Sequence, residues 1–217
     1  MFVMLKKIKD DLNVALSMDP AATSRIEVAL TYAGFHAILF HRFAHWLWEK
    51  RVPFIPRALS QFARFITGIE IHPGATIGSG MFIDHGMGVV IGETTEIGDN
   101  VTLFQGVTLG GTGKHRGKRH PTLGSHIVVG AGAKVLGPIK IGDYVKIGAN
   151  SVVLEDVPDH STVVGIPGEI VRIKGESVTD ETLLDHIGVP DPAADRFRDM
   201  QQQIDALKRE LDHFKNR

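Results

Sequence analysis

Hydrophobic residues follow two different periods along this 217-residue chain. Before residue 69, apolar side chains recur every three or four positions, which is the period of an α-helix with one buried face. The pattern predicts one helix before Asp19-Pro20, one from about Arg25 to Lys50, and a short one after Pro56. We therefore expect residues 1–68 to form a helical N-terminal domain.

From residue 69 to residue 170 the period is six. An aliphatic residue, usually followed by glycine, recurs over more residues than one amphipathic helix or hairpin can explain. This repeat is typical of a parallel β-helix, in which each hexapeptide supplies a short strand and a turn, and three hexapeptides complete a coil of about 18 residues. The repeating positions are Ile71, Ile77, Ile83, Ile91, Ile97, Leu103 and Leu109, and then Leu123, Val129, Val135, Ile141, Ile147 and Val153.

Two interruptions break the repeat. It slips by two residues at Val89-Val90, and it is interrupted by residues 111–122, which read GTGKHRGKRHPT. An insertion of this kind in a repeat protein is usually a binding loop. Counting about 18 residues per coil places Gly88 above Glu70, close to His85. We therefore expect Glu70 and His85 to lie near one another at a corner.

The hexapeptide period ends near residue 170, and residues 171–217 are predicted to contain an irregular acidic linker and a C-terminal helix. Apolar residues in the last 25 positions alternate at spacings of three and four, as in a coiled coil. This stripe, shorter than three heptads, indicates a helix that packs on itself or on another copy. Its members are Phe197, Met200, Ile204, Leu207, Leu211 and Phe214.

Composition narrows the possible chemistry. The chain has 24 Lys and Arg against 25 Asp and Glu, so it lacks a global positive charge that would bind nucleic acid or a membrane. Without cysteine it has no thiol nucleophile and no thiolate metal cluster. No secretory signal or apolar stretch of membrane-spanning length is evident, so we expect a cytoplasmic protein. His41 and His45 have metal-ligand spacing but no third ligand nearby, so we expect no metal.

His85 is the strongest candidate for acid–base chemistry. It follows Asp84 at an interruption of the repeat, and the register brings Glu70 toward it. A carboxylate that holds one imidazole nitrogen fixes the tautomer and leaves the other nitrogen free as a base near neutral pH. A single histidine in a turn is more often structural, so the hypothesis depends on the neighbouring carboxylates and on the basic loop.

Longer runs of the sequence resemble a known family. The segment GIEIHPGATIGSGMFIDHGMGVVIGE, followed by VTLGGTGK, RHP and VGAGAKVLG, closely resembles serine O-acetyltransferases. The resemblance covers most of the chain, from Asp19 to Val171. It implies a left-handed β-helix and direct transfer of an acetyl group from acetyl-CoA to the hydroxyl of L-serine, in cysteine biosynthesis.

The resemblance also implies roles for individual residues. His85 would be the general base, oriented by a carboxylate that is Asp in many members and Glu here, with a second imidazole near the serine hydroxyl. The implied catalytic residues are His85, Glu70 and His120. The implied serine-binding residues are Asp19 and Asp84 for the ammonium group and Arg119 for the carboxylate. The residues implied to line the acetyl-CoA channel are Gly111, Thr112, Ala131, Lys146 and Ala149.

The resemblance further implies a homotrimer with active sites between neighbouring prisms. A dimer of trimers stays open, because the N-terminal helical domain is short. Members that bind the sulfhydrylase partner end in Ile, whereas this chain ends in Arg217, which argues against that complex.

Three other functions are alternatives to serine acetylation. A hexapeptide acetyltransferase for a sugar or amino-sugar acceptor would keep the fold, but Asp19, Asp84 and Arg119 fit a zwitterion better than a neutral sugar. A γ-type carbonic anhydrase would need three zinc-binding histidines, and their expected spacing is absent. A non-enzymatic trimeric scaffold would leave the insertion and His85 unexplained.

Overall fold

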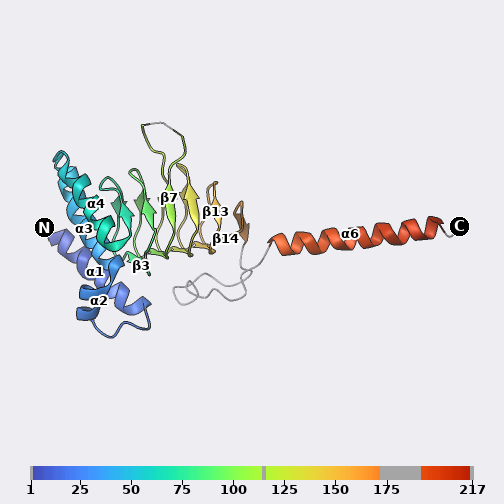
Figure 1. The fold of residues 1–217 in the computed structure, drawn as a ribbon, viewed down its shortest axis with the longest axis horizontal. Helices are drawn as coiled ribbons and strands as arrows, with labels where there is room; N and C mark the ends of the chain where they lie inside the picture. The colour runs from blue at the N-terminus through green and yellow to red at the C-terminus, as the bar shows by residue number, and fades with distance from the viewer. Residues whose placement is uncertain (1, 114–115, 172–191, 216–217) are drawn as a thin grey trace.

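A computed structural model describes residues 2–113, 116–171 and 192–215 of the chain. In Figure 1 a group of helices stands at one end of a stack of short strands, and one long helix lies beyond the other end. Within these ranges no helix is both long and apolar enough to cross a membrane. The helices are α1 (Phe2–Met18), α2 (Arg25–Thr31), α3 (Ala33–Glu49), α4 (Ile55–Thr67) and α6 (Pro192–Lys215).

The helix predicted from Arg25 to Lys50 is two helices, because the chain is extended at Tyr32 (φ −85°, ψ 109°) between α2 and α3. Ser24 caps α2 by accepting a hydrogen bond from the N–H of Glu27, and the Glu27 carboxylate accepts one from the N–H of Thr23. Apolar residues continue at the helical spacing of three or four across this break, so the period alone could not reveal the division into two helices. The break leaves the Tyr32 side chain free to reach Asp19.

The strands form a parallel β-helix with three faces. Successive strands pass from one sheet to the next, giving sheets of order β1-β4-β7-β10-β13, β11-β8-β5-β2 and β15-β14-β12-β9-β6-β3. The pairings are parallel except that of β14 with β15. The strands are β1 (Glu70–Ile71), β2 (Thr76–Ile77), β3 (Phe82–Ile83), β4 (Val90–Ile91), β5 (Glu96–Ile97), β6 (Thr102–Leu103), β7 (Thr108–Gly110), β8 (Thr122–Leu123), β9 (Val128–Val129), β10 (Lys134–Leu136), β11 (Lys140–Ile141), β12 (Lys146–Ile147), β13 (Val152–Val153), β14 (Thr162–Val164) and β15 (Glu169–Val171).

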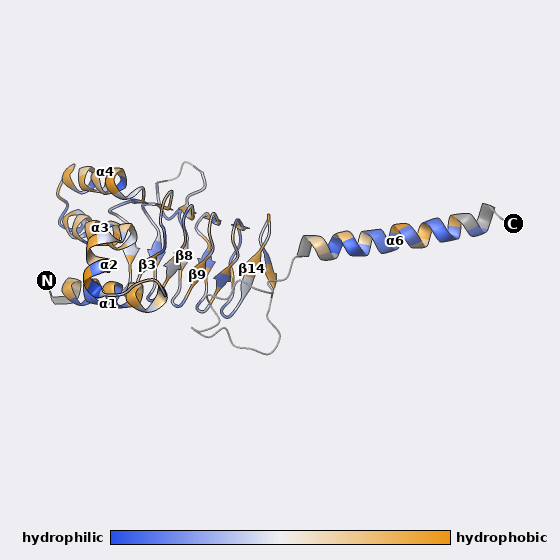
Figure 2. Cartoon of the chain, turned by 60° about the horizontal axis from the view of Figure 1, so that its bottom comes forward, coloured by the Kyte–Doolittle hydropathy of each residue, from blue (hydrophilic) through white to orange (hydrophobic). Residues whose placement is uncertain are grey.

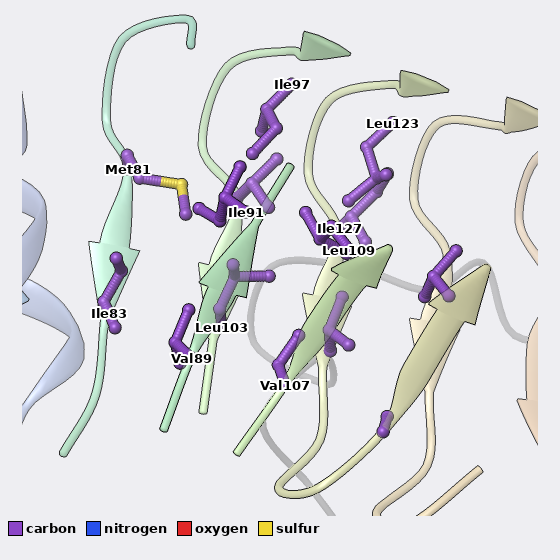
Figure 3. Packing of buried hydrophobic residues seen from close by; sticks show 14 of the residues in the cluster. Met81, Ile83, Val89, Ile91, Ile97, Leu103, Val107, Leu109, Leu123 and Ile127 are labelled. Atoms are coloured by element: carbon purple, nitrogen blue, oxygen red, sulfur yellow. The ribbon is translucent and has the colours of Figure 1, made fainter. Parts of the chain in front are cut away.

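The aliphatic residue of each hexapeptide fills the interior of this prism. Figure 3 shows Ile83, Ile91, Leu103 and Leu109 stacked inside it, and none of the four is more than 2% exposed. Full burial of one such side chain contributes about 1.5–3 kcal/mol to stability. Repeating that contribution on every coil accounts for the six-residue period of the sequence.

The first coil is longer than the sequence count assumed. Glu70 pairs with Val90, and not with Gly88, because the corner between β3 and β4 contains two extra residues. The backbone turns there through His85 at φ 58° and Gly86 at φ 73°, both in the left-handed region. The coil after the insertion has the regular spacing of 18 residues, since Thr122 pairs with Lys140. The last coil is two residues shorter, since Lys146 pairs with Thr162.

The N-terminal helices pack on the first coil and thereby place α1 and α2 beside this corner. Phe82 of β3 points outward into a second hydrophobic cluster with Val28 and Phe35 of the helices. Gly34 permits the close approach of α3, since an added Cβ there would lie 2.0 Å from the carbonyl oxygen of Ile83. On the same helices a buried ion pair joins Arg42 Nε to Asp11 Oδ2 at 2.6 Å.

Helix α6 carries the heptad stripe on its surface. Figure 2 shows apolar residues alternating with polar ones along it, and Arg196 near its start pairs with Glu169 of β15. The stripe members Phe197, Met200, Ile204, Leu207 and Leu211 are between 43% and 71% exposed. The linker predicted before this helix falls largely on residues 172–191, outside the described residues.

Candidate active site

Asp84 and His85 form the first part of the candidate site, at the long corner between β3 and β4. The hydrogen bond from the Asp84 N–H to the Leu103 carbonyl extends the pairing of β3 with β6, after which the chain turns at His85. His85 Nε2 lies 4.0 Å from Asp84 Oδ1, and the His85 side chain is 76% exposed. The imidazole is therefore held on a tight turn and open to a ligand.

Asp19 and Tyr32 join Asp84 and His85 from the helical domain, and we call these four residues the His85 cluster. Tyr32 Oη donates to Asp19 Oδ2 at 2.5 Å, and the Ala21 N–H donates to Asp19 Oδ1 at 2.8 Å. The Tyr32 hydrogen bond, more than any other contact, lowers the pKa of Asp19, and His85 adds a smaller electrostatic effect. The same bond raises the pKa of Tyr32 to about 12, so Tyr32 stays a donor and Asp19 an anion near neutral pH.

Glu70 does not contact His85. Its Oε2 lies 3.3 Å from Arg64 Nη1 of helix α4, and no ion pair within 4 Å links it to His85 among the described residues. The two extra residues in the corner explain this arrangement, because they shift the register of Glu70 to Val90.

Small residues continue the same corner on the following coils. The N–H of Gly106 donates to Met87 O, that of Gly132 to Gln105 O, and that of Asn150 to Ala131 O. Ala131 and Ala149 therefore occupy this corner on adjacent coils, farther along the prism from the helices than His85 is. Each of these two residues carries only a methyl group as its side chain.

Arg119 and His120 lie at a different corner, between β7 and β8, where the insertion leaves the prism. Arg119 Nη2 donates to Glu93 Oε2 at 2.5 Å, and this hydrogen bond is the main cause of a lowered Glu93 pKa. His120 is 8% exposed. Burial, followed by the charge of Arg119, lowers the pKa of His120 and favours its neutral form.

The residues predicted to line the acetyl-CoA channel do not all lie at one corner. Gly111 packs against the loop, since an added Cβ would lie 3.1 Å from His120 Nε2, and Thr112 is exposed beside it. Lys146 belongs to neither corner: it lies on β12 in the six-stranded sheet and is only 4% exposed. Residues 114–115 of the loop are outside the described ranges.

Comparisons with known proteins agree on one family. The hexapeptide pattern described as "Bacterial transferase hexapeptide (six repeats)" matches residues 120–155. The serine acetyltransferase of Bacillus subtilis is 58% identical over 215 residues, which is 99% of this chain and 98% of that protein. The chain belongs to the serine acetyltransferase family.

Solved structures of serine acetyltransferases have the same fold. The soybean enzyme complexed with serine superposes with a TM-score of 0.77 at 45% identity, over 79% of this chain and 70% of that one. A serine acetyltransferase in complex with CoA gives a TM-score of 0.74 at 40% identity, over 77% and 69% of the two chains. These matches confirm the predicted family and the helical domain followed by a hexapeptide β-helix.

Membership of the serine acetyltransferase family gives the charges of the site a chemical meaning. Serine is a zwitterion, and the His85 cluster supplies carboxylates whereas the loop supplies the Arg119 guanidinium. In one chain these groups sit at two different corners of the prism. Within the described ranges no group of three or more His, Asp or Glu residues is placed to hold a metal ion.

Sequence reasoning missed Tyr32, Glu93 and Thr94. Tyr32 gave no signal, because the helical period hides the break that frees it. Glu93 and Thr94 follow the aliphatic repeat position Ile91 by two and three residues, where a β-helix corner is expected. Their polar side chains, at the corner one coil before the insertion, were the sequence signal that could have indicated contacts with the inserted loop.

Proposed function

We propose that this chain transfers the acetyl group of acetyl-CoA directly to the hydroxyl of L-serine, giving O-acetyl-L-serine and CoA for cysteine synthesis. The family assignment rests on 58% identity along 99% of the chain. The observation that supports the mechanism is the His85 imidazole, which is exposed and lies beside Asp84. It is also close enough to Asp19 to contribute to the lowered pKa of that carboxylate, in addition to the larger effect of the Tyr32 hydrogen bond. An exposed imidazole on a tight turn beside a carboxylate is placed to act as a general base.

The proposed step needs no acetylated protein group. The serine hydroxyl oxygen attacks the carbonyl carbon of the thioester while its proton passes to His85. The tetrahedral intermediate then breaks its C–S bond, and the leaving CoA sulfur takes the proton back from His85. A base of this kind typically contributes a factor of about 10² to 10⁴ in rate.

Charge complementarity supports the proposed contacts with serine. Asp19 and Asp84 would hold the ammonium group beside His85, and the planar guanidinium of Arg119 would bind the carboxylate with two hydrogen bonds. Glu93 already fixes one edge of that guanidinium, which limits the orientations it can adopt. His120 would contribute the second imidazole, and its part is argued below.

Other proposed roles require a rearrangement or rest on position alone. Glu70 could orient His85 only if its carboxylate left Arg64. Lys146 would need its ammonium group uncovered to meet the nucleotide end of acetyl-CoA, because it is 4% exposed in the isolated chain. The pantetheine arm would run past Ala131 and Ala149 on one wall and past Gly111 and Thr112 on the other.

The separation of the two corners supports a homotrimer. A serine molecule is too small to contact two corners of one prism, so the His85 cluster of one copy would face the loop of the next copy around a three-fold axis. We propose a trimer as the smallest active unit, with left-handed coils as the family resemblance implies.

Helix α6 fits the same assembly. In a three-fold trimer the last coils of all three prisms lie at one end, so three copies of α6 can pair in parallel through the exposed heptad stripe.

Proposed domain boundaries near residues 68 and 170 are supported by the ends of α4 at Thr67 and of β15 at Val171. The sulfhydrylase expectation rests on residues outside the described ranges and, like cytoplasmic location, stays an expectation.

A thiol assay tests the proposed function. CoA release from acetyl-CoA is followed with L-serine, with a galactoside, and with no acceptor, for the full chain and for His85→Ala. We expect release with L-serine only, and its nearly complete loss in His85→Ala at an unchanged oligomeric mass. Release with the galactoside but not with L-serine would refute the acceptor, and an active His85→Ala variant would refute the base.

A further inference from the structure

Thr94 holds the imidazole of His120 through both its main chain and its side chain. The Thr94 N–H donates to His120 Nδ1 at 3.2 Å, and the Thr94 hydroxyl lies 2.9 Å from the same nitrogen. The hydroxyl oxygen also accepts the backbone N–H groups of Arg119 at 3.0 Å and of His120 at 3.1 Å. One threonine thus anchors the end of the inserted loop and one ring nitrogen of its histidine.

This geometry decides which ring nitrogen of His120 carries the proton. A backbone N–H can only donate, so His120 Nδ1 must offer its lone pair to Thr94. The hydroxyl oxygen already accepts two N–H groups, so its own proton is free to point at the same nitrogen. A neutral imidazole with Nδ1 as acceptor carries its proton on Nε2.

Close packing fixes the direction of that Nε2–H group. The ring lies directly on Gly92, where an added Cβ would be 2.0 Å from His120 Cδ2 and 2.1 Å from Nε2. The charged and titratable groups that act on the ring are Arg119 and Lys118 of the loop, Glu93 of the adjacent turn, and His72 after β1. Burial of the ring is the main factor that disfavours a second proton, and the two cations, which outnumber the single carboxylate, add to it.

We propose that Thr94 is a positioning residue that holds His120 as its Nε2–H tautomer, so that His120 donates a hydrogen bond to the bound substrates and leaves His85 as the base. This inference rests on the proposed acetyl transfer, and it assigns different chemistry to the two histidines of the site. Negative charge develops on the carbonyl oxygen of the thioester during attack by serine. A fixed neutral donor aimed at such an oxygen stabilises the transition state without reorganisation.

Isosteric variants separate this role from a purely structural one. Thr94→Val removes the hydroxyl and keeps the shape, Thr94→Ser restores the hydroxyl, and Thr95→Val is the matched control. Thr95 is 1% exposed, and its hydroxyl has no hydrogen-bond partner. We expect Thr94→Val to lower kcat at least about 10-fold with the KM for acetyl-CoA nearly unchanged. Thr94→Ser should recover most of the rate, and Thr95→Val should match the wild type.

A second variant guards against misfolding of the first. Gly92→Ala keeps the Thr94 hydroxyl and the hydrogen bonds that it accepts from the loop backbone, but the added methyl group must displace the imidazole, so we expect a comparable loss of kcat. Unfolding in urea checks that each variant is folded. Wild-type kcat in folded Thr94→Val would overturn the positioning role.

The tautomer can be observed without turnover. In 15N-histidine NMR spectra near neutral pH, we expect the His120 signals, assigned by their loss in His120→Asn, to show a protonated Nε2 and an unprotonated Nδ1. Thr94→Val should mix the two tautomers. A protonated Nδ1 in the wild type would overturn the inference even if serine acetylation is confirmed, whereas failure of serine acetylation would leave this spectrum unchanged.

Discussion

Mixing two inactive variants tests whether each active site draws on two copies of the chain. His85→Ala removes the proposed base from one corner, and Arg119→Ala removes the carboxylate-binding group from the other. Each variant alone should be nearly inactive when serine is far below its KM, because the rate then reports kcat/KM. Coexpression of the two chains in equal amounts, with different affinity tags, would produce mixed trimers.

The structure sets the size of the expected recovery. A site is intact only when one chain provides His85 and its neighbour provides Arg119, and with random assembly of two kinds of chain this occurs at about a quarter of the interfaces. We therefore expect about 25% of the wild-type kcat/KM, measured by CoA release and normalised to total protein.

A double variant provides the control. His85→Ala/Arg119→Ala mixed with the wild type should also give about 25% if sites lie between chains, but about 50% if each chain contains a whole site. Under the second arrangement the two single variants would recover nothing together. No recovery from the single variants, with about 50% from the double variant, would refute the shared site.

Three further predictions concern other parts of the chain. Burial lowers the pKa of His41 to about 3, so between that pH and about 6.5 the unfolded chain binds a proton that the folded chain does not. The free energy of unfolding should therefore fall by up to about 1.4 kcal/mol per pH unit on acidification, and His41→Leu should flatten this dependence in urea unfolding at pH 7 and pH 5. Glu93→Gln should raise the KM for serine about 10-fold, with little effect on the KM for acetyl-CoA, because the Arg119 guanidinium loses its charged partner. Since the chain has no cysteine, Leu207→Cys on the α6 stripe should form disulfide-linked dimers on oxidation, whereas Asp205→Cys on the opposite face should not, as a non-reducing gel would show.

The sequence period predicted the β-helix because each strand contributes the same buried position. Ile91 and Leu109 are both at most 1% exposed, and their spacing of 18 residues follows from one coil of three hexapeptides. Periodicity could not give the register of the first coil, because the corner near His85 adds two residues outside any strand. A count from Glu70 therefore reached Gly88, two residues short of its true partner.

Motif resemblance named most of the candidate site, but not the contacts that hold it. The bond from Tyr32 to Asp19 depends on a break between α2 and α3, and that break depends on one residue with an extended backbone. The contact of Thr94 with His120 spans 26 positions and an insertion. Neither contact has a sequence period, because each is made once, between side chains from different elements.

The two lengthened corners of the prism are where the candidate site residues lie. A regular corner has the same backbone conformation on every coil, so successive coils present similar surfaces there. The corner that carries His85 is two residues longer than a regular one, and the corner that carries Arg119 and His120 is eight residues longer, since Glu96 pairs with Thr122 across 26 positions. Longer corners project from the prism, whereas the aliphatic core inside it is unchanged. The solenoid can therefore keep its stability while these two corners differ from the rest, and in the proposed trimer they would meet where one prism faces another.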